Sequence, residues 1–165
     1  MPAVTIRPAT RSDAPALGRF GAALMRQHHE LDPRRFILTE RPEAGYGRFL
    51  VGQLDAPEMV LRVAELDGRV GGYVLAGLEP LDWMQLRAAC GFVHDVYVDP
   101  DARGRGIGEA LMRAAIAWLA ARGQPRAMLW SAEGNASAQR LFARLGFRRT
   151  MVEMARELEP GDAGA

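Results

Sequence analysis

The stretch FVHDVYVDPDARGRGIG, residues 92–108, is the part of the sequence from which the fold can be read. Its first seven residues are mostly apolar and β-favouring, so they predict a strand, which Asp99-Pro100 ends because proline has no amide hydrogen to donate. The next residues place glycine at every second position, and apolar residues then recur at helical spacing. A glycine loop before a helix N-terminus is typical of an anion site, because unpaired amides and the helix dipole favour negative charge. We therefore expect a phosphate or pyrophosphate on the loop Arg103–Gly108.

Two familiar phosphate loops do not fit this stretch. A nucleotide P-loop needs a lysine after its last glycine, but all 21 basic residues of the chain are arginine. A dinucleotide fingerprint needs a third glycine five residues after the first, where this chain has Glu109 or Leu111. The pattern that remains is arginine, any two residues, glycine, any residue, glycine, and its alternative interpretation is a plain structural turn.

This pattern resembles the pyrophosphate loop of the GNAT superfamily of acyl-CoA-dependent N-acetyltransferases. Residues 135–147 are similar to a second motif of that family, with Asn135, an alanine three residues later and a final Gly-Phe pair. The resemblance covers nearly the whole chain. It implies an α+β fold, in which a central mixed sheet carries helices on both faces and splays between its fourth and fifth strands, with acyl-CoA in the split.

Length and composition set the remaining bounds. The 165 residues predict a single domain over residues 1–158 and a flexible tail over residues 159–165. A net charge of +1 gives no global field for nucleic acid or membrane, and the single cysteine, Cys90, suits a reducing cytoplasm. No secretion leader is evident, and the arginine-only composition hints at a GC-rich bacterial genome. The three histidines and one cysteine are scattered, so we expect no metal site.

Periodicity and turn residues predict the other elements. Asp67-Gly68 is a strong hairpin signal, and Leu81–Ala89 reads as an insertion. Further strands are expected at Val4–Arg7, Met59–Leu66, Val70–Leu78, Ala127–Ser131 and Phe147–Leu158, and further helices from Ser12 or Asp13 to Leu31, from Pro42 to Leu54 and from Asn135 to Leu145.

The resemblance implies direct acetyl transfer from acetyl-CoA to a primary amine of a small molecule or peptide. The backbone amides of Val96 to Val98 would stabilise the oxyanion. Asn135 would hold the pantetheine arm, although an ordinary N-cap explains this residue equally well. The residues expected to bind acetyl-CoA are Val96, Tyr97, Val98, Arg103, Gly104, Arg105, Gly106, Ile107, Gly108, Glu109, Asn135 and Phe142.

His94 is the expected base for the amine proton, because imidazole titrates near neutral pH. Strand alternation places His94 on the face of Phe92 and Val96, with Asp95 and Tyr97 on the other face. The alternative is a hydrogen-bonded structural histidine. In the presumed lid, we expect His28, Glu30 and Asp32 to contact a cationic acceptor, the alternative being a solvated loop.

One residue departs from the family pattern. Phe142 stands where the family has a tyrosine that protonates the leaving thiolate, and a phenyl ring has no proton to give. This departure favours a second hypothesis, a non-catalytic acyl-CoA-binding regulatory or interaction module. The family also includes dimers, so a homodimer is plausible, although no stretch of the sequence marks an interface.

Overall fold

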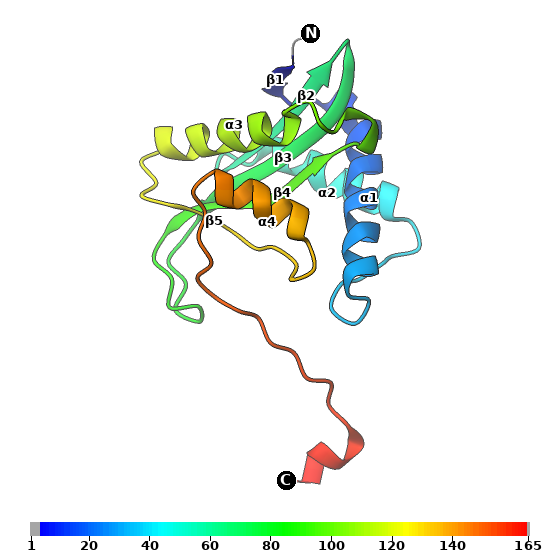
Figure 1. Cartoon of the computed structure of the whole chain (residues 1–165), viewed down its shortest axis with the longest axis vertical. Coiled ribbons are helices and arrows are strands. Elements are labelled where there is room, and N and C mark those ends of the chain that lie inside the picture. The colour runs from blue at the N-terminus through cyan, green and yellow to red at the C-terminus, as the bar shows by residue number, and fades with distance from the viewer. Residues whose placement is uncertain (1–3, 165) are drawn as a thin grey trace.

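The structure is a computed structural model and describes residues 4–164. Its centre is a five-stranded mixed sheet in the order β1-β2-β3-β4-β5, in which only the pair β4–β5 is parallel. Helices α1 and α2 cover one face of the sheet, and α3 and α4 cover the other (Figure 1). The strands are β1 (Thr5–Pro8), β2 (Met59–Leu66), β3 (Arg69–Glu79), β4 (Cys90–Val98) and β5 (Ala127–Leu129), and the helices are α1 (Ala14–Leu31), α2 (Pro42–Gly52), α3 (Ile107–Ala121) and α4 (Ala136–Arg144). The predicted α+β class with a mixed sheet and helices on both faces is confirmed.

Alternation along the strands builds a separate core on each face of the sheet. On β2, Val60 packs toward α3 while its neighbour Leu61 packs toward α1 and α2. Leu111 of α3 and Leu17 of α1 are fully buried in these two cores. The sheet therefore separates the two cores. The face to which a side chain of β4 points decides which core it packs in.

The β2–β3 hairpin turns where the sequence predicted. Asp67 and Gly68 have φ of 51° and 73°, the left-handed values that a two-residue type I′ turn requires. On the other edge of the sheet, β5 pairs with β4 only at Gly91, Phe92 and Val93. β4 continues to Val98 with β3 alone as its neighbour, so the expected splay between the fourth and fifth strands is present.

One predicted strand is wrong. Phe147–Leu158 is predicted to join the sheet, but among the described residues it pairs with no strand, and after Phe147, which packs against the α3 core, it runs as exposed chain away from the domain (Figure 1). A strand needs a partner for its backbone hydrogen bonds, and this segment finds none within its own sheet. After it, a 3-10 helix spans Pro160–Gly164 within the predicted tail, and Arg156 bonds Asp162 at 2.6 Å. No helix among residues 4–164 is both long and apolar enough to span a membrane.

Candidate active site

The glycine loop forms an open cradle of backbone amides. Gly104 and Gly106 both adopt a left-handed φ of 75°, and a Cβ at either position would meet open space. Gly106 is the N-cap of α3, and the first α-helical hydrogen bond runs from the Ala110 amide to the Gly106 carbonyl. The amides of residues 107–109 therefore have no carbonyl one turn earlier, so they remain available to an anion. This geometry fits the pyrophosphate of CoA.

The open edge of β4 begins beside this cradle. The Asp99 amide donates to the Gly71 carbonyl of β3 at 2.9 Å. Because antiparallel bonding alternates along a strand, the Tyr97 amide also faces β3, whereas the amides of Val96 and Val98 face the side that β5 leaves open. Arg103 Nε donates to the Val98 carbonyl at 3.2 Å, which closes the loop against the strand. Of the three predicted backbone donors, Val96 and Val98 are thus directed toward the split and Tyr97 is not.

A β-bulge at His94 decides which side chains of β4 share its face. Leu75 of β3 pairs with Asp95, but the next residue, Ala76, pairs with Val93, so His94 is the extra residue of β4. The bulge resets the alternation: His94 and Asp95 both line one cleft, whereas Val96 packs with the core under α3. The prediction that His94 shares a face with Val96, opposite to Asp95 and Tyr97, is therefore wrong. Tyr97 packs in the core on the cleft side, against Phe20.

The cleft has a volume of about 400 Å³ and lies on the α1–α2 face of the sheet. Aromatic rings form one wall, because Phe92 lies 5.1 Å from the rings of both His94 and Trp130. Two carboxylates, Glu79 and Asp95, also line it. The complete lining comprises Tyr46, Phe49, Gln53, Met59, Leu75, Glu79, Phe92, His94, Asp95 and Trp130.

Glu79, the last residue of β3, connects His94 to the β3–β4 loop. His94 Nε2 lies 3.2 Å from Glu79 Oε1, and Arg87 Nη2 lies 3.8 Å from the other carboxylate oxygen. The Arg87 side chain is only 9% exposed and also donates to the Cys90 sulfur at 2.9 Å. A carboxylate at Nε2 favours the ring tautomer with hydrogen on that nitrogen, so Nδ1 is left to accept a proton.

Asp95 is held by two tyrosines from other elements. Tyr46 of α2 donates its hydroxyl hydrogen to Asp95 Oδ2 at 2.6 Å, and Tyr73 of β3 donates at 3.3 Å. Burial raises the pKa of Asp95, against the effect of these hydrogen bonds and of the charges of His94 and His28. Burial and the Asp95 charge raise the pKa of both tyrosines, which therefore stay protonated as donors.

The lid residues predicted to bind the acceptor lie in the α1 end and the α1–α2 loop, where they make local contacts. His28 Nδ1 lies 2.9 Å from the Leu24 carbonyl one turn earlier. Asp32 accepts hydrogen bonds from the backbone amides of Arg34 and Arg35. Glu30 is exposed, and none of the three residues lines the cleft, although the charge of His28 reaches Asp95.

The two predicted α4 residues have clear structural contacts. Asn135 is the N-cap, and its Oδ1 accepts a hydrogen bond from the Ala138 amide at 3.3 Å. Phe142 is 8% exposed, lies in the core under α3 and packs edge-on to Phe147 at 6.1 Å. Their predicted contacts with acetyl-CoA stay predictions.

Several residues of the candidate cleft were missed from the sequence. Glu79 and Tyr73 come from β3, Tyr46 from α2 and Trp130 from the end of β5, and only the folded sheet brings them to the cleft. The one local signal was Glu79, an acidic residue that ends a long apolar strand. Within residues 4–164, no group of three or more His, Cys, Asp or Glu side chains is arranged to hold a metal ion.

Comparisons with known proteins show the family and the fold. The mycothiol acetyltransferase of Clavibacter michiganensis is 32% identical over 132 residues, which cover 75% of this chain and 39% of that protein. The chain spans 58% or less of the length of seven other curated relatives. A variant of the BH1408 protein of Bacillus halodurans superposes with a TM-score of 0.80 at 23% identity, covering 94% of this chain and 99% of that one.

A second solved structure, an aminoglycoside N-acetyltransferase in complex with CoA, has a TM-score of 0.69 at 19% identity, with 95% of this chain and 96% of that one covered. At these identities the two solved structures show a shared fold. The family model described as the acetyltransferase (GNAT) family matches residues 23–147, which include the cradle, the bulge and the Asn135 helix. The chain therefore belongs to the GNAT acetyltransferase family.

Proposed function

We propose that this protein is an N-acetyltransferase that uses acetyl-CoA to acetylate a primary amine of a small molecule or peptide. The observation that carries the proposal is the position of His94 at the bulge of β4, where its ring lines the cleft two residues before Val96, whose amide faces the open split. A proton acceptor and an oxyanion donor thus lie on adjoining parts of one strand, next to a cradle for an anion.

Each part has one task. The amides of residues 107–109, with Arg103 and Arg105 nearby, would hold the pyrophosphate. When bound, acetyl-CoA supplies an acetyl thioester, whose carbonyl carbon passes from sulfur to the amine nitrogen. The Val96 amide is directed toward the split, where the carbonyl oxygen gains charge.

The proton of the attacking amine goes to His94, whose ring Glu79 orients. No side chain in the cleft is assigned to protonate the thiolate, because Phe142 has no proton and both tyrosines in contact with Asp95 hold theirs firmly. Solvent is then the proton source, and a thiolate leaves adequately near neutral pH, since the free thiol has a pKa of about 8.5.

The cleft favours an acceptor that combines a cation with an apolar body. Phe92, Trp130 and Phe49 supply aromatic walls, and Glu79 and Asp95 supply negative charge. Aromatic faces and carboxylates both attract ammonium groups. A cationic amine with a second amino group or an aromatic substituent meets all of these surfaces.

The test is amine-dependent release of free CoA. Purified protein is incubated with acetyl-CoA and a panel of polyamines, aralkylamines, amino sugars and peptide N-termini, and thiol release is followed with a chromogenic reagent. We expect turnover with cationic amines that is strongly reduced in His94→Ala. If acetyl-CoA binds in calorimetry but no amine gives turnover, the non-catalytic binding module suggested by Phe142 is correct.

A further inference from the structure

Arg87 is a buried arginine at the base of the β3–β4 loop (residues 80–89), and the proposed reaction gives it no task. Its side chain is 9% exposed, although arginine is seldom buried unless its charge and its donors are paired. Nη1 donates to the Cys90 sulfur at 2.9 Å, whereas Nε is buried and has no hydrogen-bond partner among the described residues. Because a buried guanidinium with an unused donor contributes little to stability, its position indicates another role.

Two carboxylates share the charge of Arg87. Nη2 lies 3.8 Å from Glu79 Oε2 and 4.0 Å from Asp82 Oδ2. Without the guanidinium between them, these two negative charges would repel each other. With the guanidinium in place, the Glu79 carboxylate can stay beside the cleft, where its other oxygen, Oε1, lies 3.2 Å from His94 Nε2.

The backbone holds Arg87 within reach of Glu79. Asp82 and Arg87 exchange two backbone hydrogen bonds of 2.8 and 2.9 Å, so the loop closes as a short hairpin. Glu79 and Cys90 lie opposite each other at the end of the β3–β4 ladder. The guanidinium faces Glu79 through Nη2 and bonds Cys90 through Nη1, so it spans this last pair of the ladder.

We propose that Arg87 is a positioning residue, which fixes the Glu79 carboxylate against Nε2 of His94 and so leaves Nδ1 of the ring to accept the amine proton. This inference rests on the proposed function, because it takes His94 as the proton acceptor. The contacts run from guanidinium to carboxylate to imidazole, so Arg87 acts only through Glu79. A forked guanidinium suits this task, since one nitrogen is held by Cys90 while the other faces the carboxylate.

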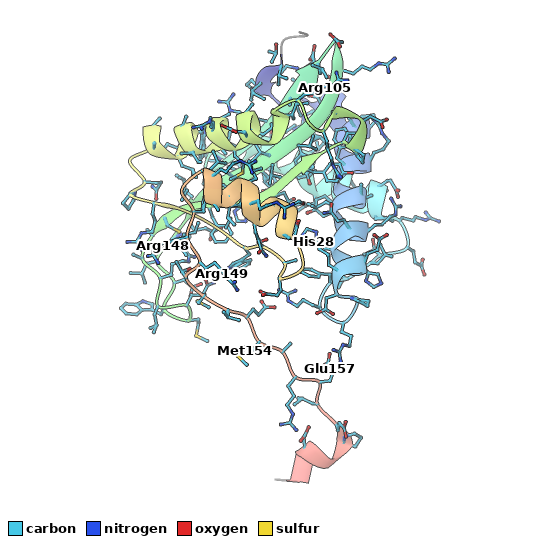
Figure 2. The ribbon with its side chains drawn as sticks, in the orientation of Figure 1. His28, Arg105, Arg148, Arg149, Met154 and Glu157 are labelled. Carbon is cyan, nitrogen blue, oxygen red and sulfur yellow. The ribbon has the colours of Figure 1, made fainter. Side chains whose placement is uncertain are left out.

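The anion cradle lies away from this network, so the kinetics of acetyl-CoA provide an internal control. Figure 2 shows Arg105 of the cradle near the top of the view, whereas the β3–β4 loop, green in Figure 1, lies at the lower left of the domain. The KM for acetyl-CoA should therefore stay within about twofold in every variant of Arg87.

The test is a double-mutant cycle between Arg87→Met and Glu79→Gln. Arg87→Met should lower kcat about tenfold, the low end of the loss seen when an outer contact of a functional histidine is removed. Its Tm should be unchanged or higher, because methionine fills similar space without a buried charge. In the Glu79→Gln background the same change should alter kcat by less than about twofold, since Arg87 acts through the Glu79 charge.

Asp82→Asn is the matched control. It removes the charge of the other carboxylate near Nη2, 4.0 Å away, but leaves Arg87 and Glu79 in place. We expect kcat to stay within about twofold of the parent value. If Arg87→Met does not fold, Arg87→Gln, which keeps polar atoms at the base of the loop, goes through the same cycle.

Crystal structures of the parent and of Arg87→Met give a readout that needs no turnover. Glu79 Oε1 should lie within about 3.5 Å of His94 Nε2 in the parent and beyond about 4 Å in the variant. If the parent acetylates no amine, the proposed function fails, while the displacement of the carboxylate still tests the role of Arg87. An unmoved carboxylate in the variant, or an equal loss of kcat in both Glu79 backgrounds, would overturn that role.

Discussion

His94 and Asp95 both reach the cleft because β4 has one residue more than β3 opposite it. Val93 packs under α3, so alternation turns the next residue, His94, toward the cleft, and without the bulge Asp95 would face the core under α3. The extra residue lets Val93 and Val96 both pack in that core while His94 and Asp95 both face the cleft. Bulges are common beside active sites for this reason, since they redirect a side chain without ending the strand.

We predict that His94→Ala lowers kcat by roughly 10²- to 10⁴-fold, because it removes a positioned base. The KM for acetyl-CoA should stay within about twofold, since the ring lies in the acceptor cleft and not at the cradle. Steady-state kinetics with an accepted amine provide the measurement.

Glu79→Gln is the companion change. It keeps the size of the side chain but removes the charge 3.2 Å from Nε2, so kcat should fall by less than in His94→Ala. The double variant should be no slower than His94→Ala alone, since Glu79 acts through the imidazole. Additive losses in the double variant would mean that Glu79 contacts the acceptor independently.

Strand alternation could not have shown this arrangement. The residue types in FVHDVYV placed the strand correctly and singled out His94, which lines the cleft, because β-propensity and side-chain chemistry are local properties. The bulge depends on how β3 pairs with β4, and pairing register is a property of two strands. A single unpaired residue then reversed the predicted faces of Val96, Asp95 and Tyr97.

At the scale of elements, the N-terminus of α3 makes the sharpest binding prediction. Gly106→Glu should reduce acetyl-CoA affinity in calorimetry by at least about tenfold, because it adds bulk and negative charge where the free amides converge. Gly123→Glu is the matched control, since Gly123 follows the other end of α3 with a similar φ of 71° and also faces open space. Equal losses in the two variants would point to backbone strain and argue against the cradle.

The ion pair between Arg7 and Asp13, at the corner between β1 and α1, should make the stability of the fold depend on pH. Arg7 holds Asp13 by two hydrogen bonds of 2.8 and 2.9 Å, and this contact, together with bonds from Thr10, lowers the pKa of Asp13 from 3.8 to about 2. Because the folded-state pKa is depressed, the stabilisation is complete above about pH 4 and is lost as pH falls toward 2.

Asp13→Asn should therefore cost roughly 1–2 kcal/mol of unfolding free energy at neutral pH. The free energies of unfolding of the two proteins, measured by urea titration, should become equal as the pH falls from 4 to 2, because the parent's carboxylate becomes protonated in this range. A constant difference across that range would show that Asp13 contributes through packing and not through its charge.

The hairpin, whose two strands are neighbours in the sequence, was predicted correctly. The strand predicted at Phe147–Leu158, which needs a partner from elsewhere in the chain, was predicted wrongly. The Met59–Leu66 strand and its turn at Asp67-Gly68 lie where the sequence placed them, because a hairpin carries its own partner. Phe147–Leu158 has a strand's alternation, but it pairs with no strand within residues 4–164. A sequence pattern shows that a segment is suited to a ladder and does not show whether a partner strand lies beside it.

At the scale of the whole molecule, the cleft is the place where distant parts of the chain converge. Asp95 of β4 is reached by Tyr46, which lies 49 positions earlier in the sequence on a helix, and by Tyr73, which lies 22 positions earlier on the neighbouring strand. No local spacing encodes such contacts, so the acceptor site was predicted in the lid loop, whereas the structure assembles a candidate cleft on the sheet. A buried carboxylate at this junction is costly when charged, and burial raises its pKa accordingly.

Asp95→Asn removes the free-energy penalty of ionising this buried carboxyl group. The pKa of Asp95 is raised above its ordinary 3.8, so ionisation as pH rises from about 4 destabilises the fold, and the neutral amide avoids this penalty. The side-chain amide oxygen of the variant can still accept hydrogen bonds from the two tyrosines. We expect the Tm of Asp95→Asn to equal or exceed that of the parent at pH 7.5, with the gap narrowing toward pH 4, while the KM for a cationic acceptor rises by about 10- to 100-fold.

Tyr73→Phe is the matched control for Asp95→Asn. It removes the 3.3 Å contact to the same carboxylate but keeps the charge in the cleft, so it should lower the Tm and leave the KM for the acceptor nearly unchanged. A fall in Tm for Asp95→Asn without any change in KM would assign the carboxylate to the scaffold. If Asp95→Asn keeps its Tm but has a higher KM for the acceptor, the buried carboxylate binds the acceptor's cation and does not stabilise the fold.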